Sequence, residues 1–204
     1  KEHNPFRKVE DQEHRKVNLG LNNELDLIGG ALIGEMVILG GRRGAGKSVI
    51  CCNLAVDQYS QGKIAPYFTI EMNADEISDR IMSIMARVTS SGIREQTLEG
   101  SELLKLALTK SLMYIDGFNI FDKYSSCTEM GDLANLVDDL NQSTELNHPL
   151  YIIDDRELKL STVDITGSTL KTKYGDLMSM LIVDYVNQLN IDGSRDDKLD
   201  WKSQ

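Results

Sequence analysis

The sequence is poor in the features that mark secreted, membrane-spanning or fibrous proteins. It has three cysteines in 204 residues: Cys51 and Cys52 are adjacent and cannot readily bridge within one helix, and Cys127 adds no metal-ligand pattern. We therefore expect free thiols and a reducing compartment. No uninterrupted apolar run approaches the ~18 residues of a membrane span, and residues 1–27 are too polar and charged for a signal peptide.

Positive charge is also scarce. The chain has 22 Lys and Arg residues against 32 Asp and Glu residues, a formal net charge of −10. This balance argues against a protein whose whole surface binds nucleic acid, although a local basic loop remains compatible with DNA contact. The hydrophobic fraction of 41% and the charged fraction of 26% are those of a soluble globular domain. The length fits one sizeable domain with a real core.

Strand-like and helical segments alternate from Gly34 onward, which predicts an α/β fold around a mostly parallel sheet. Short apolar runs predict buried strands at Met36–Leu39 and Pro66–Ile70. Helices are expected over residues 46–61 and 74–88, the second opened by a capping pair, Asn73 and Glu76. Three further apolar runs end in aspartate: Leu112–Asp116, Leu150–Asp154 and Met180–Asp184. A helix between them has one apolar face: Met130, Leu133, Val137 and Leu140.

One glycine-rich segment has the spacing of a phosphate-binding loop. Residues 41–48 match G-x-x-x-x-G-K-[ST] at every fixed position, after a predicted strand and at the start of a predicted helix. The members of the loop are Gly41, Arg42, Arg43, Gly44, Ala45, Gly46, Lys47 and Ser48. Glycines let backbone N–H groups turn toward phosphates, and the helix N-terminus adds its positive end. We expect Lys47 to neutralise the β- and γ-phosphates of ATP and Ser48 to join a Mg²⁺ shell. A glycine-rich turn with an exposed lysine is the alternative interpretation.

Carboxylates that follow predicted strands are candidates for the hydrolytic step. Glu71 lies just beyond the second strand, at the sheet edge that carries the phosphate loop, where a carboxylate can orient and deprotonate a water. A glutamate favoured by the helix dipole is the alternative. A second carboxylate is needed for Mg²⁺, and spacing alone leaves three candidates open: Asp116, Asp154 and Asp184. Asp184 follows the cleanest β-rich run, and the polar groups Asn187 and Gln188 behind it are suited to sensing the γ-phosphate.

The other reactive side chains form no cluster in the sequence. His3, His14 and His148 are scattered and expected to be solvated. Cys51 and Cys52 are expected to fill core space on the helix after the phosphate loop.

Taken together, these motifs resemble the RecA-like motor domain of DnaB-type hexameric replicative helicases. The similarity covers Val17–Arg87 and Leu150–Leu189 and is densest in GGRRGAGKS, in FTIEMNADEISDRIMSIMARV, and in LYIIDD followed by MLIVDY. The resemblance implies a RecA-like P-loop NTPase core with a mostly parallel sheet flanked by helices, incomplete at its C-terminal side. Residues 1–18 would be a linker or arm, 19–204 a partial ATPase domain, and 92–148, which match poorly, an insertion.

The resemblance also assigns roles to residues. It implies that Lys47 and Ser48 hold phosphates and Mg²⁺, that Glu71 activates water, and that Asp184 supports Mg²⁺. The family usually has a glutamine three residues after that aspartate, where this chain has an asparagine, so the γ-phosphate sensor is Asn187 or Gln188. The DNA-gripping loops of the family follow the aspartate strand, and this chain contains only their first part, Asn190–Gln204.

The implied function is that of an ATP- and Mg²⁺-dependent motor in a ring-forming replicative helicase. Such a motor translocates on single-stranded DNA as a homohexamer and unwinds duplex DNA, with a primase or helicase loader as further partners and no membrane. It works in the cytoplasm, at the nucleoid or replisome. If the source is a bacteriophage, as the divergence of this sequence from the family would allow, it works in the host cytoplasm. Two other functions stay open: a RecA-class recombinase ATPase, and a regulatory ATP-binding module that assembles with little turnover.

Overall fold

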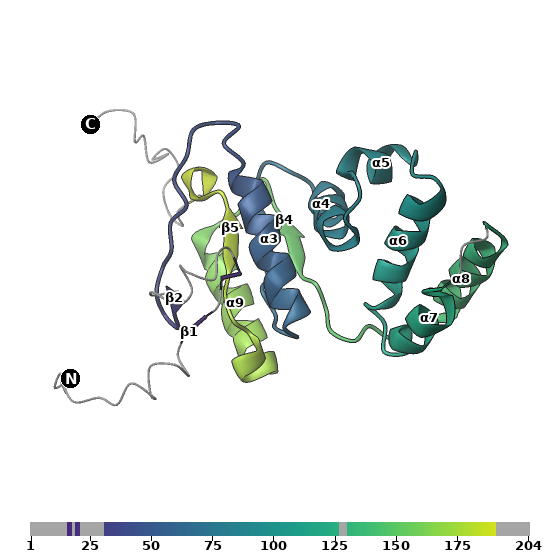
Figure 1. Cartoon of the computed structure of the whole chain (residues 1–204). Helices are drawn as coiled ribbons and strands as arrows, with labels where there is room; N and C mark the ends of the chain where they lie inside the picture. The colour runs from purple at the N-terminus through teal and green to yellow at the C-terminus, as the bar shows by residue number, and fades with distance from the viewer. Residues whose placement is uncertain (1–15, 18, 21–30, 127–129, 191–204) are drawn as a thin grey trace.

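A computed structural model describes residues 16–17, 19–20, 31–126 and 130–190. It contains a small parallel sheet with helices on both faces and a group of helices that extends to one side (Figure 1). A two-stranded antiparallel ribbon, β1 (Lys16–Val17) with β2 (Ala31–Leu32), precedes these layers. None of the helices within the described ranges is long and apolar enough to cross a membrane.

The parallel sheet has three strands in the order β4-β3-β5. They are β3 (Tyr67–Thr69), β4 (Ile152–Asp154) and β5 (Ile182–Asp184). The central strand β3 is aligned so that Thr69 lies opposite Asp154 on one side and opposite Asp184 on the other. The strands expected near residues 66–70, 150–154 and 180–184 are therefore confirmed, as is their parallel direction.

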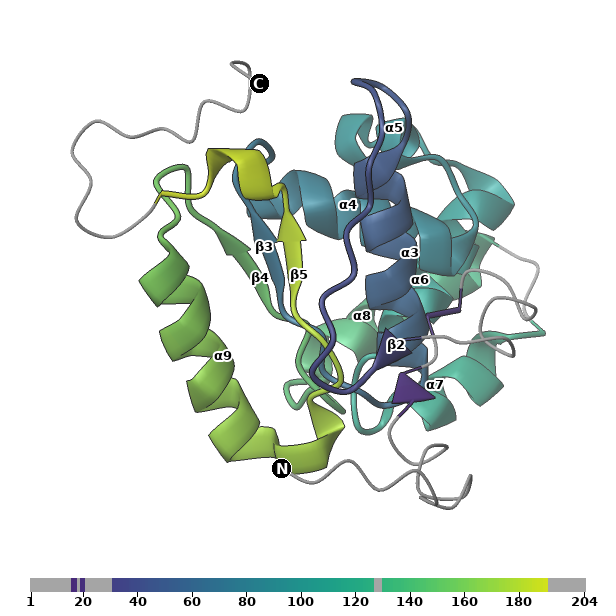
Figure 2. The ribbon, with the colours of Figure 1, turned by 90° about the vertical axis from the view of Figure 1, so that its left-hand side faces the viewer.

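Helices cover both faces of this sheet, as Figure 2 shows. On one side lie α3 (Lys47–Ser60) and α4 (Ala74–Ala86), and on the other lies α9 (Leu160–Tyr174), which is followed by the short 3-10 helix η1 (Gly175–Leu177). A second 3-10 helix, η2 (Val186–Gln188), follows β5.

The side chains of β3 point alternately to the two faces of the sheet and pack in two separate cores. Tyr67 packs with Cys52 and Ile77 in the core under α3 and α4. The next residue, Phe68, packs with Val163 of α9 in the other. Successive side chains of a strand point to opposite faces, so a strand buried on both sides is apolar throughout. Cys52 is fully buried in the first core, which confirms its expected role as a core filler.

Helix α4 begins where its local sequence predicts. The Asn73 side chain accepts a hydrogen bond from the Glu76 N–H at 2.8 Å, and the Glu76 carboxylate accepts one from the Asn73 N–H at 3.2 Å. This reciprocal capping box satisfies two N–H groups that the first turn leaves without partners. Ile77 and Ile81 of the same helix are fully buried against the sheet.

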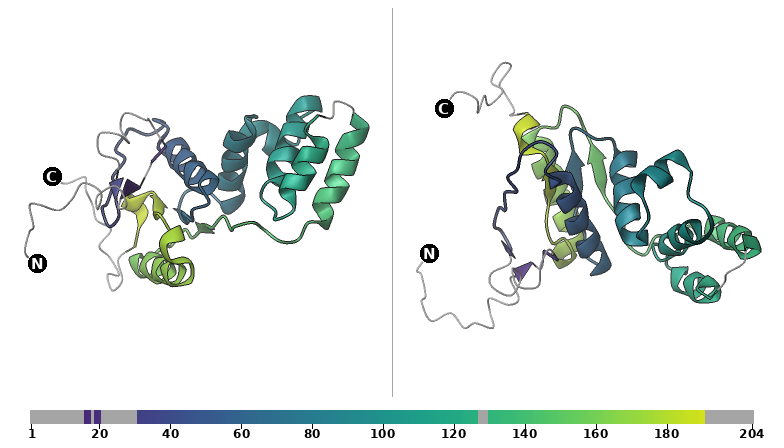
Figure 3. Two further views of the ribbon diagram at one scale, coloured as in Figure 1. Left: turned by 60° about the horizontal axis from the view of Figure 1, so that its bottom comes forward. Right: turned by 45° about the horizontal axis from the view of Figure 1, so that its top comes forward.

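Four helices after α4 form a helical unit, and the last three of them share a core. They are α5 (Ser90–Glu95), α6 (Gly100–Ser111), α7 (Gly117–Tyr124) and α8 (Met130–Gln142). Figure 3 shows this helical unit projecting away from the sheet. Its core includes the fully buried Leu136, with Leu133 and Leu140 beside it. The expected apolar face is partly wrong, because Val137 is 42% exposed and Leu136 points inward instead. The unit occupies most of the segment expected to be an insertion, residues 92–148.

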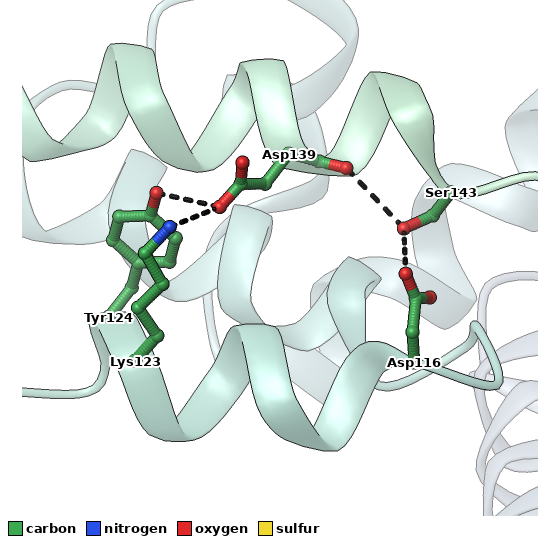
Figure 4. A network of polar contacts seen from close by, with 5 residues as sticks. All are labelled: Asp116, Lys123, Tyr124, Asp139 and Ser143. Carbon is green, nitrogen blue, oxygen red and sulfur yellow. Dashed lines mark hydrogen bonds and ion pairs between the residues drawn. The ribbon is translucent and has the colours of Figure 1, made fainter.

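Polar contacts join the last two of these helices (Figure 4). The Lys123 ammonium and the Tyr124 hydroxyl both donate to the same Asp139 carboxylate oxygen at 2.8 Å. These hydrogen bonds, with that from Lys123 the stronger, lower the pKa of Asp139. One turn further on, the Ser143 hydroxyl donates to the carboxylate of Asp116 at 2.9 Å.

The prediction of a strand at Met36–Leu39 is wrong in the structure. Residues 35–40 have no regular structure (Figure 2). Met36 is 83% exposed and Ile38 is 76% exposed, whereas Leu39 packs against the first core. An apolar run becomes a strand only where a neighbouring strand satisfies its backbone N–H and C=O groups. Here β5 pairs with β3 alone among the described strands, and this segment forms no ladder with it.

The prediction of a strand at Leu112–Asp116 is also wrong. This segment is a turn between α6 and α7, with only an isolated bridge from Tyr114 to Leu146. The turn is tight because Gly117 lies against the backbone of Ser111, and any side chain at position 117 would overlap the Ser111 carbonyl oxygen. The chain therefore reverses where the apolar pattern predicted extension, and Asp116 precedes a helix instead of ending a strand.

His148 is not solvated as expected. Its ring stacks on that of Tyr59 with centroids 3.9 Å apart, and its Nε2 lies 2.9 Å from the Tyr59 carbonyl oxygen. This contact ties the segment that returns from the helical unit to the C-terminal end of α3. His3 and His14 lie outside the described residues.

Candidate functional site

The phosphate-binding loop leads directly into α3. Gly44 and Gly46 have φ angles of 78° and 85°, in the left-handed region, and Gly46 is the N-cap of the helix. Only glycine adopts such angles without steric cost, which is a physical reason for glycine at the fixed motif position 46 and at the variable position 44. The first turn of α3 contains no acidic residue, so its positive N-terminal end is not neutralised locally.

Lys47 lies over this loop. Its ammonium donates to the carbonyl oxygens of Gly41 at 2.9 Å and Arg42 at 3.1 Å. The cation is thus held at the mouth of the loop by two neutral acceptors. A phosphate oxygen would attract it more strongly, because the opposite charges of phosphate and ammonium add a Coulomb attraction that a neutral carbonyl oxygen lacks.

Glu71 lies at the carboxyl end of β3, in the short connection to α4. The shape of this connection is set by the buried Thr69, whose hydroxyl donates to the Met72 carbonyl oxygen at 2.9 Å and accepts from the Met72 N–H at 3.2 Å. Both ends of the connection are therefore fixed, one by Thr69 and the other by the capping box of α4. The Glu71 side chain between them is exposed.

An open cavity of about 670 Å³ brings the loop and Glu71 together. The residues that line it are Arg43, Ser48, Ile70, Glu71, Met72, Glu76, Arg80 and Arg156. Three guanidinium groups gather here in a chain of net charge −10, and within the described residues none of them forms an ion pair with a carboxylate. The cavity can hold an anion such as a terminal phosphate, with a carboxylate beside it to orient a water.

Asp184 ends β5 on the other side of the central strand. Its side chain is 7% exposed, does not line the cavity, and accepts a hydrogen bond from the Tyr67 hydroxyl at 2.8 Å. Burial, and then the charge of Asp184, raises the pKa of the nearby Cys51 thiol to about 12. Burial is also the main reason that the pKa of the Tyr67 hydroxyl is raised. Both groups therefore stay protonated at neutral pH.

The two other aspartates considered for Mg²⁺ have structural partners. Asp154, at the end of β4, accepts a hydrogen bond from the Ala74 N–H at 3.0 Å and so caps the first turn of α4. Asp116 belongs to the helical unit and binds Ser143. Neither of them lines the cavity.

The side chains available for a divalent cation are a hydroxyl and a carboxylate, Ser48 and Asp184. No three His, Cys, Asp or Glu side chains gather as a metal site in the parts of the chain that are described. Mg²⁺ commonly takes one or two protein ligands and completes its shell with phosphate oxygens and waters. Ser48 lines the cavity, and Asp184 lies close enough to Cys51, one turn further along α3, for its charge to act on that thiol.

Of the two residues proposed as γ-phosphate sensors, Asn187 is not brought to the cavity. Asn187 lies exposed in η2 and is not among the lining residues. The side chain of Gln188 lies outside the described part of the structure, as does the segment from residue 191 to 204 with its expected DNA-gripping loop.

Sequence reasoning missed three residues of this region: Tyr67, Thr69 and Arg156. The hydroxyl-bearing Tyr67 and Thr69 alternate with Phe68 inside an otherwise apolar strand, which was the available signal for polar contacts on one face of the sheet. Arg156 follows the strand-ending Asp154 by two residues, but its place beside Glu71 depends on the pairing of β4 with β3.

Comparison with known proteins gives one family and one structural likeness. The model of the DnaB-like helicase C terminal domain matches residues 17–202. No curated protein sequence matches the chain. Among solved structures, the ATPase domain of G40P aligns with a TM-score of 0.44 and 12% sequence identity, over 77% of this chain and 45% of that one. The chain thus spans less than half the length of this structural relative.

Proposed function

Since the chain belongs to the DnaB-like helicase C-terminal domain family, we propose that it is the ATP-hydrolysing motor domain of a ring-forming replicative DNA helicase. The observation that carries this proposal is that Ser48 of the phosphate-binding loop and Glu71 line the same cavity. An ATP-hydrolysing site needs these two components next to each other, because the base must reach the water that attacks the terminal phosphate.

In the proposed mechanism, the loop binds the phosphates of ATP through its backbone N–H groups and the N-terminal end of α3. Lys47 leaves the carbonyl oxygens of Gly41 and Arg42 and neutralises the β- and γ-phosphates. Glu71 orients a water for attack in line with the bond that breaks and accepts its proton. Ser48 and Asp184 would hold Mg²⁺, which would neutralise charge on the phosphates when bound.

We further propose that six copies assemble into a ring on single-stranded DNA, and that hydrolysis drives translocation and duplex unwinding. Family membership supports this part of the proposal. A primase or a helicase loader, and a place in the cytoplasm at the replication fork, belong to the same proposal.

The test is ATP hydrolysis by the longest natural version of the chain, with and without single-stranded DNA, over a range of protein concentrations. Stimulation by DNA that steepens with concentration supports a ring motor with shared sites. Turnover that responds to neither variable would leave a self-contained ATP-binding module. Duplex unwinding in the same preparation separates a helicase from a recombinase, which would catalyse strand exchange instead.

Two variants separate nucleotide binding from hydrolysis. Lys47→Ala removes the cation that meets the phosphates and is expected to abolish nucleotide binding, measured with a fluorescent ATP analogue. Glu71→Gln keeps the size of the side chain but cannot accept a proton, so binding is expected to persist while turnover falls by at least a hundredfold, within the ~10²–10⁴-fold range of general-base catalysis. Lys110→Ala, on α6 of the helical unit, is the control. Parent-like turnover by Glu71→Gln would show that another group is the base.

A further inference from the structure

Tyr67 and Asp184 form a buried hydroxyl–carboxylate pair within the sheet. Tyr67 is fully buried, Asp184 is 7% exposed, and the Tyr67 hydroxyl donates to Asp184 Oδ2 at 2.8 Å. This contact joins the central strand β3 to its neighbour β5 through side chains, in addition to their backbone ladder.

The parallel register explains why these two side chains meet. Tyr67 lies directly opposite Ile182, so Asp184 is two residues further along β5 and on the same face of the sheet. Diagonal neighbours on one face of a sheet lie roughly 7–8 Å apart, a span that a tyrosine ring and its hydroxyl can bridge. A smaller polar side chain at position 67 would not reach.

The body and the tip of Tyr67 have separable roles. Its ring packs in the first core with Cys52, Ile77 and Ile182, and phenylalanine would fill the same space. The hydroxyl adds only the contact with Asp184 Oδ2. One carboxylate oxygen is thereby anchored, which fixes the rotation of the carboxyl group and leaves Oδ1 for another partner.

We propose that Tyr67 is a positioning residue that orients the Asp184 carboxylate toward the cation accompanying the bound nucleotide. This inference rests on the proposed function, in which Asp184 supports Mg²⁺. A carboxylate held in one orientation loses no rotational freedom when it meets the cation shell, so a preorganised ligand binds more tightly than a free one. The same strand continues to Glu71, so β3 would position both carboxylates of the site, one through Tyr67 and one through the turn that Thr69 fixes.

The test is Tyr67→Phe in the full chain. The affinity for N-methylanthraniloyl-ADP is measured in excess Mg²⁺ and in excess EDTA. We expect the affinity in Mg²⁺ to fall by roughly tenfold, the scale of one hydrogen bond to a charged group, and the affinity in EDTA to stay unchanged. Tyr59→Phe is the matched control, because Tyr59 is also buried but donates to the His148 carbonyl oxygen, which precedes β4 and so lies away from the carboxyl ends of the strands. Its affinities should match those of the parent under both conditions.

A double-mutant cycle with Asp184→Asn completes the test. If Tyr67 acts through Asp184, adding Tyr67→Phe to Asp184→Asn causes no further loss of Mg²⁺-dependent affinity. This comparison also serves if Tyr67→Phe alone does not fold, because the double variant leaves no buried carboxylate without a donor. A further loss in the double variant, or an equal loss in Mg²⁺ and in EDTA for Tyr67→Phe, would overturn the inference. Lys47→Ala tests the proposed function separately from the role of Tyr67. If Lys47→Ala binds nucleotide like the parent, the proposed function fails. If Lys47→Ala does not bind nucleotide and Tyr67→Phe binds it like the parent, only the role of Tyr67 is rejected.

Discussion

At the scale of single residues, the cavity beside Glu71 is notable for its arginines. Arg156 reaches it from the turn after β4, Arg80 from α4 and Arg43 from the phosphate-binding loop. Three elements far apart in the sequence therefore supply positive charge to one place. A charge that meets the terminal phosphate should distinguish ATP from ADP, because ADP lacks that group.

We predict that Arg156→Ala weakens binding of a non-hydrolysable ATP analogue by roughly tenfold, the loss expected for one charge-assisted hydrogen bond, and changes ADP binding little. Equilibrium titration with fluorescent forms of both nucleotides measures the two affinities. Arg94→Ala is the control, since Arg94 is exposed on α5 and lies outside the cavity. An equal loss for ATP and ADP would mean that Arg156 does not contact the terminal phosphate.

At the scale of elements, the start of α4 is fixed from two directions. The capping box holds it from within, and Asp154 of β4 accepts a hydrogen bond from the Ala74 N–H. Because the connection that carries Glu71 ends at this helix, Asp154 acts on the site through the backbone. This role needs an acceptor and does not need a negative charge.

The cap leads to a prediction about the two strand-ending aspartates. Asp154→Asn retains an acceptor and should lower ATP turnover only slightly, whereas Asp154→Ala should cost about 1 kcal/mol of unfolding free energy, as lost helix caps do. Asp184→Asn should reduce turnover far more than Asp154→Asn. Urea unfolding and steady-state turnover measure the two effects. A larger loss of turnover for Asp154→Asn would reassign the carboxylate that supports Mg²⁺.

The same elements show how far the sequence predicts the fold. Helix α4 was predictable because its signals are local: a capping pair and apolar residues at helical spacing. Like the strands that end in Asp154 and Asp184, the segment Leu112–Asp116 is a run of apolar residues that ends in aspartate. Its different structure depends on the close approach of Gly117 to Ser111, which no local pattern records. The run Met36–Leu39 failed for a related reason, since an apolar run does not indicate whether a neighbouring strand pairs with it.

At the site, the sequence predicted the phosphate-binding loop and Glu71, and the structure brings Ser48 and Glu71 to one cavity. It did not identify the partners that depend on strand register. Arg156 joins the cavity, and Tyr67 meets Asp184, only because β3 lies between β4 and β5. Strand order is a property of the assembled sheet, so these contacts could not be predicted from spacing alone.

At the scale of the whole molecule, the chain has separate cores in the sheet layers and in the helical unit. We propose that the helical unit is an insertion that leaves the nucleotide site intact. We predict that Leu136→Ala, which empties a fully buried position of the unit, destabilises it by about 2–5 kcal/mol. Amide hydrogen exchange should accelerate in α6, α7 and α8, while β3 and the nucleotide affinity stay unchanged.

Ile81→Ala is the comparison for this experiment, because Ile81 is equally buried but packs in the first core, between the sheet and the helices α3 and α4. It should accelerate exchange in α3 and β3. If Leu136→Ala accelerated exchange in β3 to the same extent, the two cores would unfold as one unit and the insertion would be integral to the motor.

The central position of β3 has a consequence for the nascent chain. Both strands that flank β3 come later in the sequence, β4 beginning at residue 152 and β5 at residue 182. At ~5–20 residues per second, the ribosome leaves Tyr67 and Phe68 without a partner strand for roughly 4–20 seconds. The helical unit, built from contacts close in sequence, can fold during that wait. The sheet forms only after β4 and β5 have been made, so the pocket between the phosphate-binding loop, Glu71 and Arg156 closes after the helical unit has been synthesised, and apolar strand edges are open to chaperones until then.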